Sequence, residues 1–418
     1  MVAALIRRLW DSFRTDSLFQ NSIYLILSTG TIAGFAFLFW LICSQLFTPS
    51  EIGTATTLIS AMTVISYASL LGFNNTFVRF LPTSSDRNNE LNTGLLLSAG
   101  GAILLSLLYL IAIPQVAPKL IFLRENLWYE LSFLIIAACS ALNLLSDFIF
   151  VALRAAKYNL LIDGFILGGT KLLLPFVFLG LGAYGVFAAF GAATLIAMLV
   201  SLGFLIAKFE YRPSLRLHWL TLTKVAHYSA ATHVANLLNM APVLVMPLIV
   251  LNHLGQAAAG YYFLAFTIAN LLYGVVYAVA HSLFAEGSYD EQHLKKLVWR
   301  SIVVIGSVLI PGATILFFGA SLVLRMFGNS YASEAVAVLQ IFVIASPAVA
   351  LHVLGTFVLR IKKRVYSLII VNIIYFVTIN GLAYIWVDRG LVWIGYAWLS
   401  GNLFAGLASI VAFLKKNS

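Results

Sequence analysis

The sequence has 418 residues, of which 61% are hydrophobic and only 10% are charged. Soluble domains average about 45–50% apolar and about 25% charged residues, so this chain cannot cover itself with a hydrated surface. Lipid must therefore surround most of it, and in lipid only helices or closed barrels satisfy every backbone polar group. Long apolar runs without alternation favour helices, so the sequence predicts an all-α polytopic membrane protein.

Residues 1–20 are predicted to form an amphipathic helix that lies on the membrane surface. Their apolar side chains recur with helical spacing, at Leu5, Ile6, Leu9, Trp10 and Phe13. Charged side chains take the opposite face of this helix. A frayed polar leader is the alternative interpretation.

Twelve apolar segments follow, each close to the ~20 residues that a helix needs to cross a bilayer. The first six predicted spans are 21–44, 53–78, 93–113, 130–152, 160–181 and 183–206. The second six are 226–250, 258–284, 300–320, 335–359, 366–387 and 391–414.

The net charge of +10 would suggest nucleic acid in a soluble protein, but here the charges fall in short loops between spans. Such charges report membrane topology, because cytoplasmic loops carry an excess of Lys and Arg. Most of the 25 Lys and Arg residues fall on one side of the predicted membrane. The opposite side holds Lys119, Arg124, Arg325 and Arg389. The bias places both termini in the cytoplasm of a multi-pass protein of the cell inner (plasma) membrane, with no nucleic-acid partner.

The two halves of the chain resemble each other at an offset near 207 residues. SEIG at 50–53 is matched by AAAG at 257–260, and FIFVALRAAKY at 148–158 by TFVLRIKKRVY at 356–366. Superposing the Leu-Arg pair that both segments contain equates Arg154 with Arg360. We therefore predict an N-lobe at 21–210 and a C-lobe at 211–418. Each would be a bundle of six helices, related by a pseudo-two-fold axis along the membrane normal, with a substrate cavity between them.

The sequence lacks the motifs of the enzymes that act at membranes. GGTK at 168–171 lacks the Gly-Lys-Ser/Thr order of a phosphate loop, and no His-Glu-x-x-His pair is present. Cys43 and Cys139 have no metal-ligand spacing. We expect a transporter without catalytic residues, cofactor or metal. A proton or cation gradient, substrate mass action or partner proteins would drive it.

Two charged residues lie within predicted spans. Lys171 stands about eleven residues into its span, roughly 16 Å deep at 1.5 Å per residue, where a charge costs about 2.5–3.5 kcal/mol. It shares a helix face with Gly164 and Gly168, and small residues mark a protein-facing side. We predict that Lys171 binds an anionic substrate. A structural pair with Asp147 is the alternative, and Asp147 could instead bind a coupling proton or cation.

Further candidates for substrate binding are basic or polar. Arg79, Arg154 and Arg360 end three predicted spans and could bind phosphate in a bidentate way, although ordinary topological anchoring is the alternative. Polar side chains also recur at helical spacing in the seventh and eighth spans. Sugar hydroxyls and interhelical hydrogen bonds are equally good interpretations of them. They are His233, Asn236, Asn270, Tyr273, Tyr277 and His281.

The segment FTPSEIGTATTLISAMTVISYASLLGFNNTFVRFLP at 47–82 resembles the second span of polysaccharide flippases in the multidrug/oligosaccharidyl-lipid/polysaccharide exporter superfamily. The segment at 254–290 resembles the same span more weakly. The resemblance extends over nearly the whole chain through its span number and length. It implies a V-shaped molecule with a cationic cavity that opens alternately inward and outward. The implied cargo is a polyprenyl-diphosphate-linked oligosaccharide, the repeat unit of an O-antigen, capsule or exopolysaccharide. A glycan polymerase, a chain-length regulator and membrane lipid are the implied partners.

Other classes of membrane protein fit less well. Multidrug exporters of the same superfamily usually carry an acidic residue in the first span, and 21–44 contains none. A peptidoglycan-precursor flippase would be expected to have two additional spans. A glycan polymerase would need a large external loop, and a non-transporting scaffold would have no use for Lys171 and Asp147.

Overall fold

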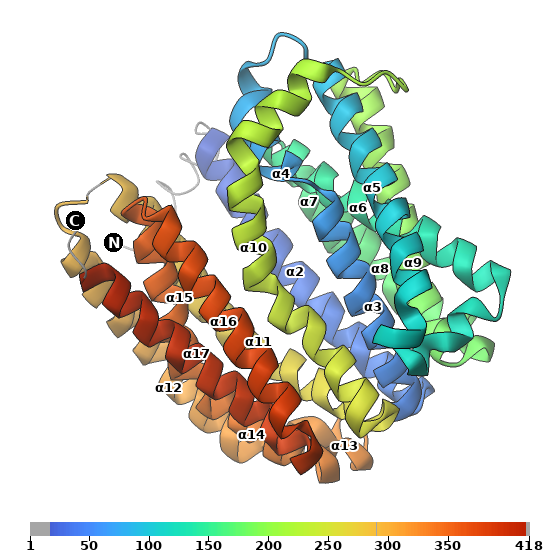
Figure 1. Ribbon diagram of the computed structural model, residues 1–418, viewed down its shortest axis with the longest axis vertical. Helices are drawn as coiled ribbons and strands as arrows, with labels where there is room; N and C mark the ends of the chain where they lie inside the picture. Colours follow the sequence, from blue (N-terminus) through green and yellow to red (C-terminus); the bar gives the residue numbers. More distant parts are fainter. Residues whose placement is uncertain (1–16, 290, 415–418) are drawn as a thin grey trace, which may run out of the picture. The chain divides into compact units, whose positions relative to one another are not determined.

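The computed structural model describes residues 17–289 and 291–414, and within these residues every regular element is a helix (Figure 1). The first half contains α2 (Ser17–Leu46), α3 (Pro49–Ser69), α4 (Phe73–Phe80), η1 (Leu81–Thr83), α5 (Arg87–Val116), η2 (Pro118–Arg124), α6 (Leu127–Ala152), α7 (Lys157–Asn159), η3 (Leu160–Leu167), α8 (Gly168–Val177), η4 (Leu179–Leu181) and α9 (Ala183–Phe209). The second half contains α10 (Trp219–Leu254), α11 (Gln256–Tyr289), α12 (Leu294–Arg325), α13 (Asn329–Glu334), α14 (Val336–Ile344), α15 (Ser346–Ile361), α16 (Val365–Trp386), η5 (Val387–Arg389) and α17 (Leu391–Leu414).

The helices confirm the prediction of an all-α polytopic membrane protein. Eleven of the described helices are long and apolar enough to cross a bilayer, and a bent pair makes a twelfth span. Each of the twelve coincides with one of the twelve segments expected from the sequence. The amphipathic helix predicted for residues 1–20 lies almost wholly outside the described residues, because the first described residue is Ser17.

Two spans are less regular than the sequence suggested. The expected span 53–78 is two helices, since α3 ends at Ser69 and α4 begins only at Phe73. Leu71 and Gly72 between them have positive φ angles of 51° and 90°, a left-handed conformation that ends a helix. The expected span 335–359 is the pair α14 and α15, bent by 42°. Pro347 stands in the first turn of α15 and has no N–H with which to continue the helix from α14.

The chain divides into two compact units, each described here by itself. One unit combines residues up to Leu46 with Ala61–Val234, and the other combines Phe47–Ser60 with the residues from Ala235 onward. The helices α3 and α10 therefore each pass from one unit to the other. The beginning of α3 belongs with the second half of the chain, although its sequence belongs to the first repeat.

Within the second unit, α3 and α11 cross at two glycines that the repeat makes equivalent. A Cβ on Gly53 would overlap the carbonyl oxygen of Gln256 and lie 2.6 Å from the nitrogen of Gly260. Reciprocally, a Cβ on Gly260 would overlap the carbonyl oxygen of Pro49 and lie 3.2 Å from the nitrogen of Gly53. Each glycine thus faces the residue four positions before its counterpart. A reciprocal contact of this kind is the mark of a local two-fold relation.

The ends of α6 and α15 show that one part of the sequence alignment is wrong. In α6 the amide of Ala155 donates to the Phe150 carbonyl at 2.8 Å, and Arg154 has a φ of 54°. In α15 the amide of Arg364 donates to the Leu359 carbonyl at 2.9 Å, and Lys363 has the same φ. Both are Schellman ends, which match Arg154 with Lys363 and not with Arg360. The alignment had followed a shared Leu-Arg pair and missed the helix end by three residues.

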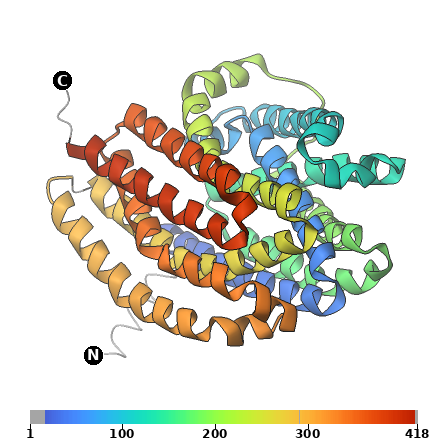
Figure 2. The ribbon, with the colours of Figure 1, turned by 60° about the horizontal axis from the view of Figure 1, so that its bottom comes forward.

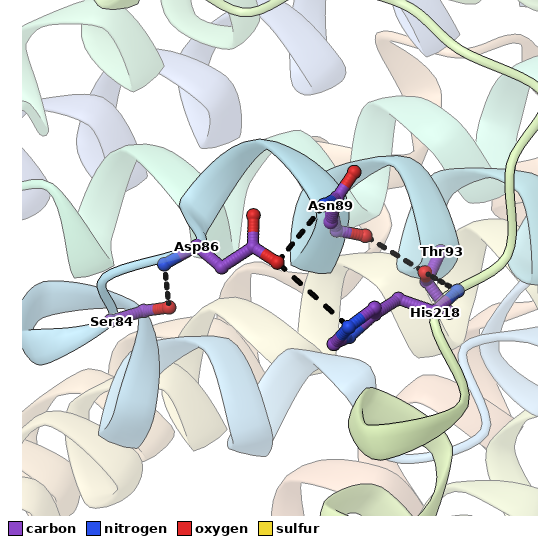
Figure 3. A network of polar contacts seen from close by, with 5 residues as sticks. All are labelled: Ser84, Asp86, Asn89, Thr93 and His218. Carbon is purple, nitrogen blue, oxygen red and sulfur yellow. Dashed lines mark hydrogen bonds and ion pairs between the residues drawn. The ribbon is translucent and has the colours of Figure 1, made fainter.

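Polar side chains at the start of α5 hold the segment that connects α9 with α10 (Figure 3). The Thr93 hydroxyl accepts from the His218 amide at 2.9 Å, and the Asp86 carboxylate lies 3.9 Å from the His218 ring. The Asn89 amide donates to the same carboxylate at 2.9 Å. The His218 end of the connection is therefore fixed by both backbone and side-chain contacts.

Asn92, one turn into the same helix, binds the other end of this connection. Its amide donates to the Arg212 carbonyl at 3.0 Å, and its oxygen accepts from the Tyr211 hydroxyl at 2.7 Å and the Ser214 amide at 2.8 Å. Burial raises the pKa of the Tyr211 hydroxyl, which is therefore a donor at neutral pH and remains one further into the alkaline range. The connection between the two repeats is thus tied to the first repeat.

The α3–α11 crossing predicts that Gly53→Ala destabilises the protein. The added methyl group has no room against the Gln256 carbonyl, and such overpacking costs about 1–3 kcal/mol. Thermal unfolding in detergent, followed by size-exclusion chromatography, should show a lower midpoint. Gly260→Ala should match it, because the contact is reciprocal. Gly30→Ala is the control, since nothing lies within 4 Å of its Cβ position. Equal midpoints for Gly53→Ala and Gly30→Ala would contradict the crossing.

Candidate functional site

The first unit buries a group of charged and amide side chains between α6 and the span formed by α7, η3 and α8. Asn143 and Asp147 stand one turn apart on α6, and Asp163 and Lys171 come from η3 and α8. Asn143 and Asp163 are buried, while Asp147 and Lys171 are half-buried. We call these four residues the N-half charge cluster. Its members lie within predicted membrane spans, where an unpaired charge is expensive.

Asp163 is the centre of this cluster, and the sequence analysis missed it. The Asn143 amide donates to the Asp163 carboxyl group at 2.9 Å, and the Asp163 and Asp147 side chains share a hydrogen bond. Two carboxyl groups can share a hydrogen bond only if one carries a proton, because two carboxylates in contact repel each other. The pair can therefore hold one proton between them.

Lys171 reaches the cluster from the next turns of the same span. Its Nζ lies 3.6 Å from the centroid of the Phe190 ring on α9, which is a cation–π contact. The carboxyl group that acts on it electrostatically is that of Asp163. The sequence had offered Asp147 as a structural partner of Lys171, and the structure adds Asp163 as an electrostatic one. Asp163 stands eight residues before Lys171 in an otherwise uncharged part of the span, and that spacing was the available signal.

The backbone around Asp163 is a π-helix from Leu160 to Leu167. π-helical turns are rare and are frequent at functional sites. On the opposite side, Gly164 and Gly168 let this span approach α2. A Cβ on Gly168 would lie 2.6 Å from the Phe35 ring, and one on Gly164 would lie 3.4 Å from the Thr31 methyl group. Close packing on α2 thus holds the irregular turn that presents Asp163.

The second unit brings three of the predicted side chains together. The His281 ring packs edge-on against the Phe357 ring at 4.9 Å, and the Arg360 guanidinium lies 5.1 Å from the same ring. Arg360 also lies within electrostatic range of Tyr277 and His281, both exposed on α11. We call Tyr277, His281 and Arg360 the C-half cluster. A cation beside two exposed aromatic rings suits a phosphate and the face of a sugar.

The remaining predicted residues lie apart from these two clusters. Tyr273 is 1% exposed and donates to the Phe342 carbonyl at 2.6 Å, and the buried His233 ring lies 3.3 Å from the Ala68 carbonyl. Both make interhelical contacts, the alternative interpretation of the polar stripes. Asn236 is half-buried and Asn270 is exposed. Arg79 and Arg154 are exposed at helix ends, with Arg79 5.4 Å from the Phe80 ring.

Among the described residues, no three His, Cys, Asp or Glu side chains are grouped so that they could hold a metal ion. His352 is 2% exposed and lies 3.2 Å from the Asn402 side-chain oxygen. Its ring also packs on that of Tyr375 at 4.2 Å between centroids. His352 is a packing residue.

The fold is that of the multidrug/oligosaccharidyl-lipid/polysaccharide exporter superfamily. A lipid II flippase, MurJ, in an inward closed conformation has a TM-score of 0.74 at 13% identity, with 95% of this chain and 87% of that chain covered. An inward-facing multidrug resistance transporter of the MATE family has a TM-score of 0.66 at 15% identity, covering 94% and 96%. A superfamily transporter from Pyrococcus furiosus has a TM-score of 0.65 at 14% identity, covering 95% and 94%.

The family model described as polysaccharide biosynthesis protein matches residues 42–337. The chain belongs to this family, as the resemblance of its second span to polysaccharide flippases had predicted. No sequence among the curated proteins matches it.

The geometry of the N-half charge cluster predicts that Asp163 and Lys171 contribute to stability together. Asp163→Asn leaves Lys171 without its carboxylate, and Lys171→Met removes the cation that Asp163 faces. The double variant removes both charges, so its loss of stability should fall short of the sum by about 0.5–3 kcal/mol. Thermal unfolding of the four proteins measures this difference. Lys157, exposed at the start of the same span, supplies the control: Lys157→Met should be additive with Asp163→Asn. If the effects of Asp163→Asn and Lys171→Met are also additive, the two side chains do not stabilise each other and the prediction is wrong.

Proposed function

We propose that this protein flips polyprenyl-diphosphate-linked oligosaccharides from the cytoplasmic to the outer leaflet by alternating access. The observation that carries the proposal is the cation Lys171, held inside a membrane span of a chain from a polysaccharide biosynthesis family. A diphosphate is the part of such a substrate that a membrane interior rejects most strongly, and a fixed cation offsets that cost. The C-half cluster adds a second cation, Arg360, beside aromatic rings.

The charge distribution of the loops supports the direction of transport. The side rich in Lys and Arg is the cytoplasmic side, so both termini lie in the cytoplasm. The membrane is then the inner, or plasma, membrane, where lipid-linked repeat units are made on the cytoplasmic face. A glycan polymerase and a chain-length regulator would receive the flipped units on the other side.

Two related functions compete with this proposal, because the fold is shared with multidrug transporters and a lipid II flippase. The family match favours a glycan cargo over a drug. The absence of an acidic residue from 23–46, the part of the first span that the structure describes, also favours it over a cation exporter. The number of spans favours it over a peptidoglycan-precursor flippase, which is expected to have two more.

The hydrogen-bonded carboxyl pair Asp147–Asp163 supports coupling to protons. A proton held between the two groups leaves one negative charge near Lys171, and its release leaves two. The change of one charge beside a fixed cation alters how strongly that cation attracts an anionic cargo. Proton release and substrate binding would therefore oppose each other at one site.

Flipping should depend on Lys171. In liposomes that contain the purified protein and a fluorescent polyprenyl-diphosphate-linked sugar, a membrane-impermeant quencher reports the sugar that has crossed. Lys171→Ala should slow flipping by about tenfold or more, since one charged hydrogen bond is worth about 1.5–3 kcal/mol. Lys171→Glu should abolish it.

Lys119→Ala, outside the predicted spans, should flip at the wild-type rate. A Lys171→Ala protein that folds and flips normally would remove Lys171 from the mechanism. A wild-type protein that moves fluorescent drugs but no lipid-linked sugar would replace the proposal with its first competitor.

The carboxyl pair should make flipping respond to a proton gradient. Asp147→Asn keeps the hydrogen bond to Asp163 but can no longer share a titrating proton. Flipping by this variant should be the same with and without an imposed pH difference, whereas the wild-type rate should change several-fold. Glu130→Gln, in the first turn of the same helix, is the matched control. A normal response in Asp147→Asn would exclude coupling at this pair.

A further inference from the structure

An apolar groove runs along α12 in the second unit, on a surface that none of the predicted functional residues line. It consists of two adjoining cavities of about 570 and 280 Å³, which share Leu309, Ile310 and Pro347. The walls come from α12, α15 and α17 in the larger cavity and from α12, α14 and α15 in the smaller. These are the orange to dark red helices that group together in Figure 2. Ligand pockets measure about 300–1,000 Å³, so the larger cavity falls within this range and the smaller lies just below it.

Two backbone features border the groove. The 42° bend between α14 and α15 turns Pro347 away from the line of α14, and Gly306 on α12 leaves space beside it. The nearest atom to a Cβ on Gly306 would be Cδ1 of Ile310, at 3.9 Å. The space is therefore part of the backbone arrangement and does not depend on one side-chain rotamer.

The length of the groove selects its occupant. Its lining on α12 runs from Lys295 to Phe318, which is roughly 35 Å at 1.5 Å per residue. The hydrocarbon core of a bilayer is about 30 Å thick, so one leaflet, and the acyl chain of an ordinary phospholipid, reaches about 15 Å. A groove that crosses both leaflets fits a chain longer than a phospholipid offers, as a polyprenyl chain is.

The charge at the mouth of the groove fits the same lipid. Lys295 lines the larger cavity where α12 begins and where α15 and α17 end, at the predicted cytoplasmic side. Among the described residues Lys295 has no carboxylate partner, whereas the nearby Lys362 pairs with Glu291 at 2.7 Å. Arg364 is also engaged there, since it donates to the Ala412 carbonyl at 2.6 Å. The far end, at Phe317 and Phe318, is apolar.

We infer that this groove binds the polyprenyl chain of the lipid carrier, with its phosphate at Lys295 and its tail toward Phe318. This inference rests on the proposed function for the identity of the carrier. It adds a site outside both charged clusters. The chain would stay on the lipid-facing side of α12, α15 and α17 and would anchor the carrier to the protein.

Photolabelling of the full chain in nanodiscs tests the site without any transport. The probe is undecaprenyl phosphate with a diazirine at the far end of its chain. Peptide mass spectrometry locates the crosslinked residues. In the wild-type protein we expect crosslinks at Phe317, Phe318 and Ala313. Crosslinks mainly near Lys295, or spread evenly over the exposed faces of α12, would overturn the inference.

Substitutions in the groove test whether labelling depends on its shape and charge. Gly306→Trp fills the groove and should lower labelling about tenfold, as small changes of fit in apolar sites can. Val303→Trp is the matched control, because Val303 is 54% exposed on the same helix and lines neither cavity. Lys295→Gln should weaken labelling, and Lys296→Gln should not. Equal labelling of Gly306→Trp and Val303→Trp would overturn the site.

Competition by three unlabelled lipids identifies the bound lipid. Unlabelled undecaprenyl phosphate should compete, while farnesyl phosphate and phosphatidylglycerol should not, since neither chain crosses the bilayer. Competition by phosphatidylglycerol would make the groove a phospholipid site and overturn the assignment. If the protein flips lipid-linked sugar but is not labelled in this way, only the assignment of the groove is wrong. If the protein is labelled as expected but does not flip lipid-linked sugar, only the proposed function is wrong.

Discussion

The hydrocarbon core of a membrane offers no hydrogen-bond partner, and the local structure of this protein depends on that constraint. A span can leave the regular α-helix only where the protein itself supports the departure. Three such departures occur in the described spans: the break at Leu71–Gly72, the π-helix around Asp163 and the bend before Ser346. Two of the three carry the features with functional meaning. The π-helix presents Asp163 to its partners, and the bend opens the groove along α12.

The two halves of the chain share a plan but use it for different chemistry. The first half places a carboxyl pair beside an amide and a lysine. The second half places Arg360 beside exposed rings and adds an apolar groove with one cation at its mouth. Pseudo-symmetry thus fixed the backbone, while the side chains of the halves diverged. In the proposed flippase one half would respond to protons, and the other would hold the carrier lipid.

The number and position of the spans could be predicted, because each is a long apolar segment that only a helix can satisfy in lipid. Lys171 could also be found, since a lone charge in such a segment is conspicuous. Its partner was missed, although Asp163 stands only eight residues before Lys171, because Asp163 lies on a π-helical turn that ordinary helical spacing does not describe. The register of the repeat failed at Arg360 for a similar reason. A helix end is set by a backbone conformation, at Lys363, and not by the residue type that the two halves share.

The reciprocal contact of Gly53 with Gly260 also bears on how the chain arose. If a shorter, six-span ancestor assembled as a homodimer, this glycine lay against its own copy, and any larger residue would have entered the interface twice. Duplication and fusion would have freed the two positions to change separately. The backbone spacing at the crossing still leaves no room for a Cβ on either side. On that origin the crossing would keep dimer geometry within a single polypeptide, and the connection that Asn92 holds would replace two free chain ends.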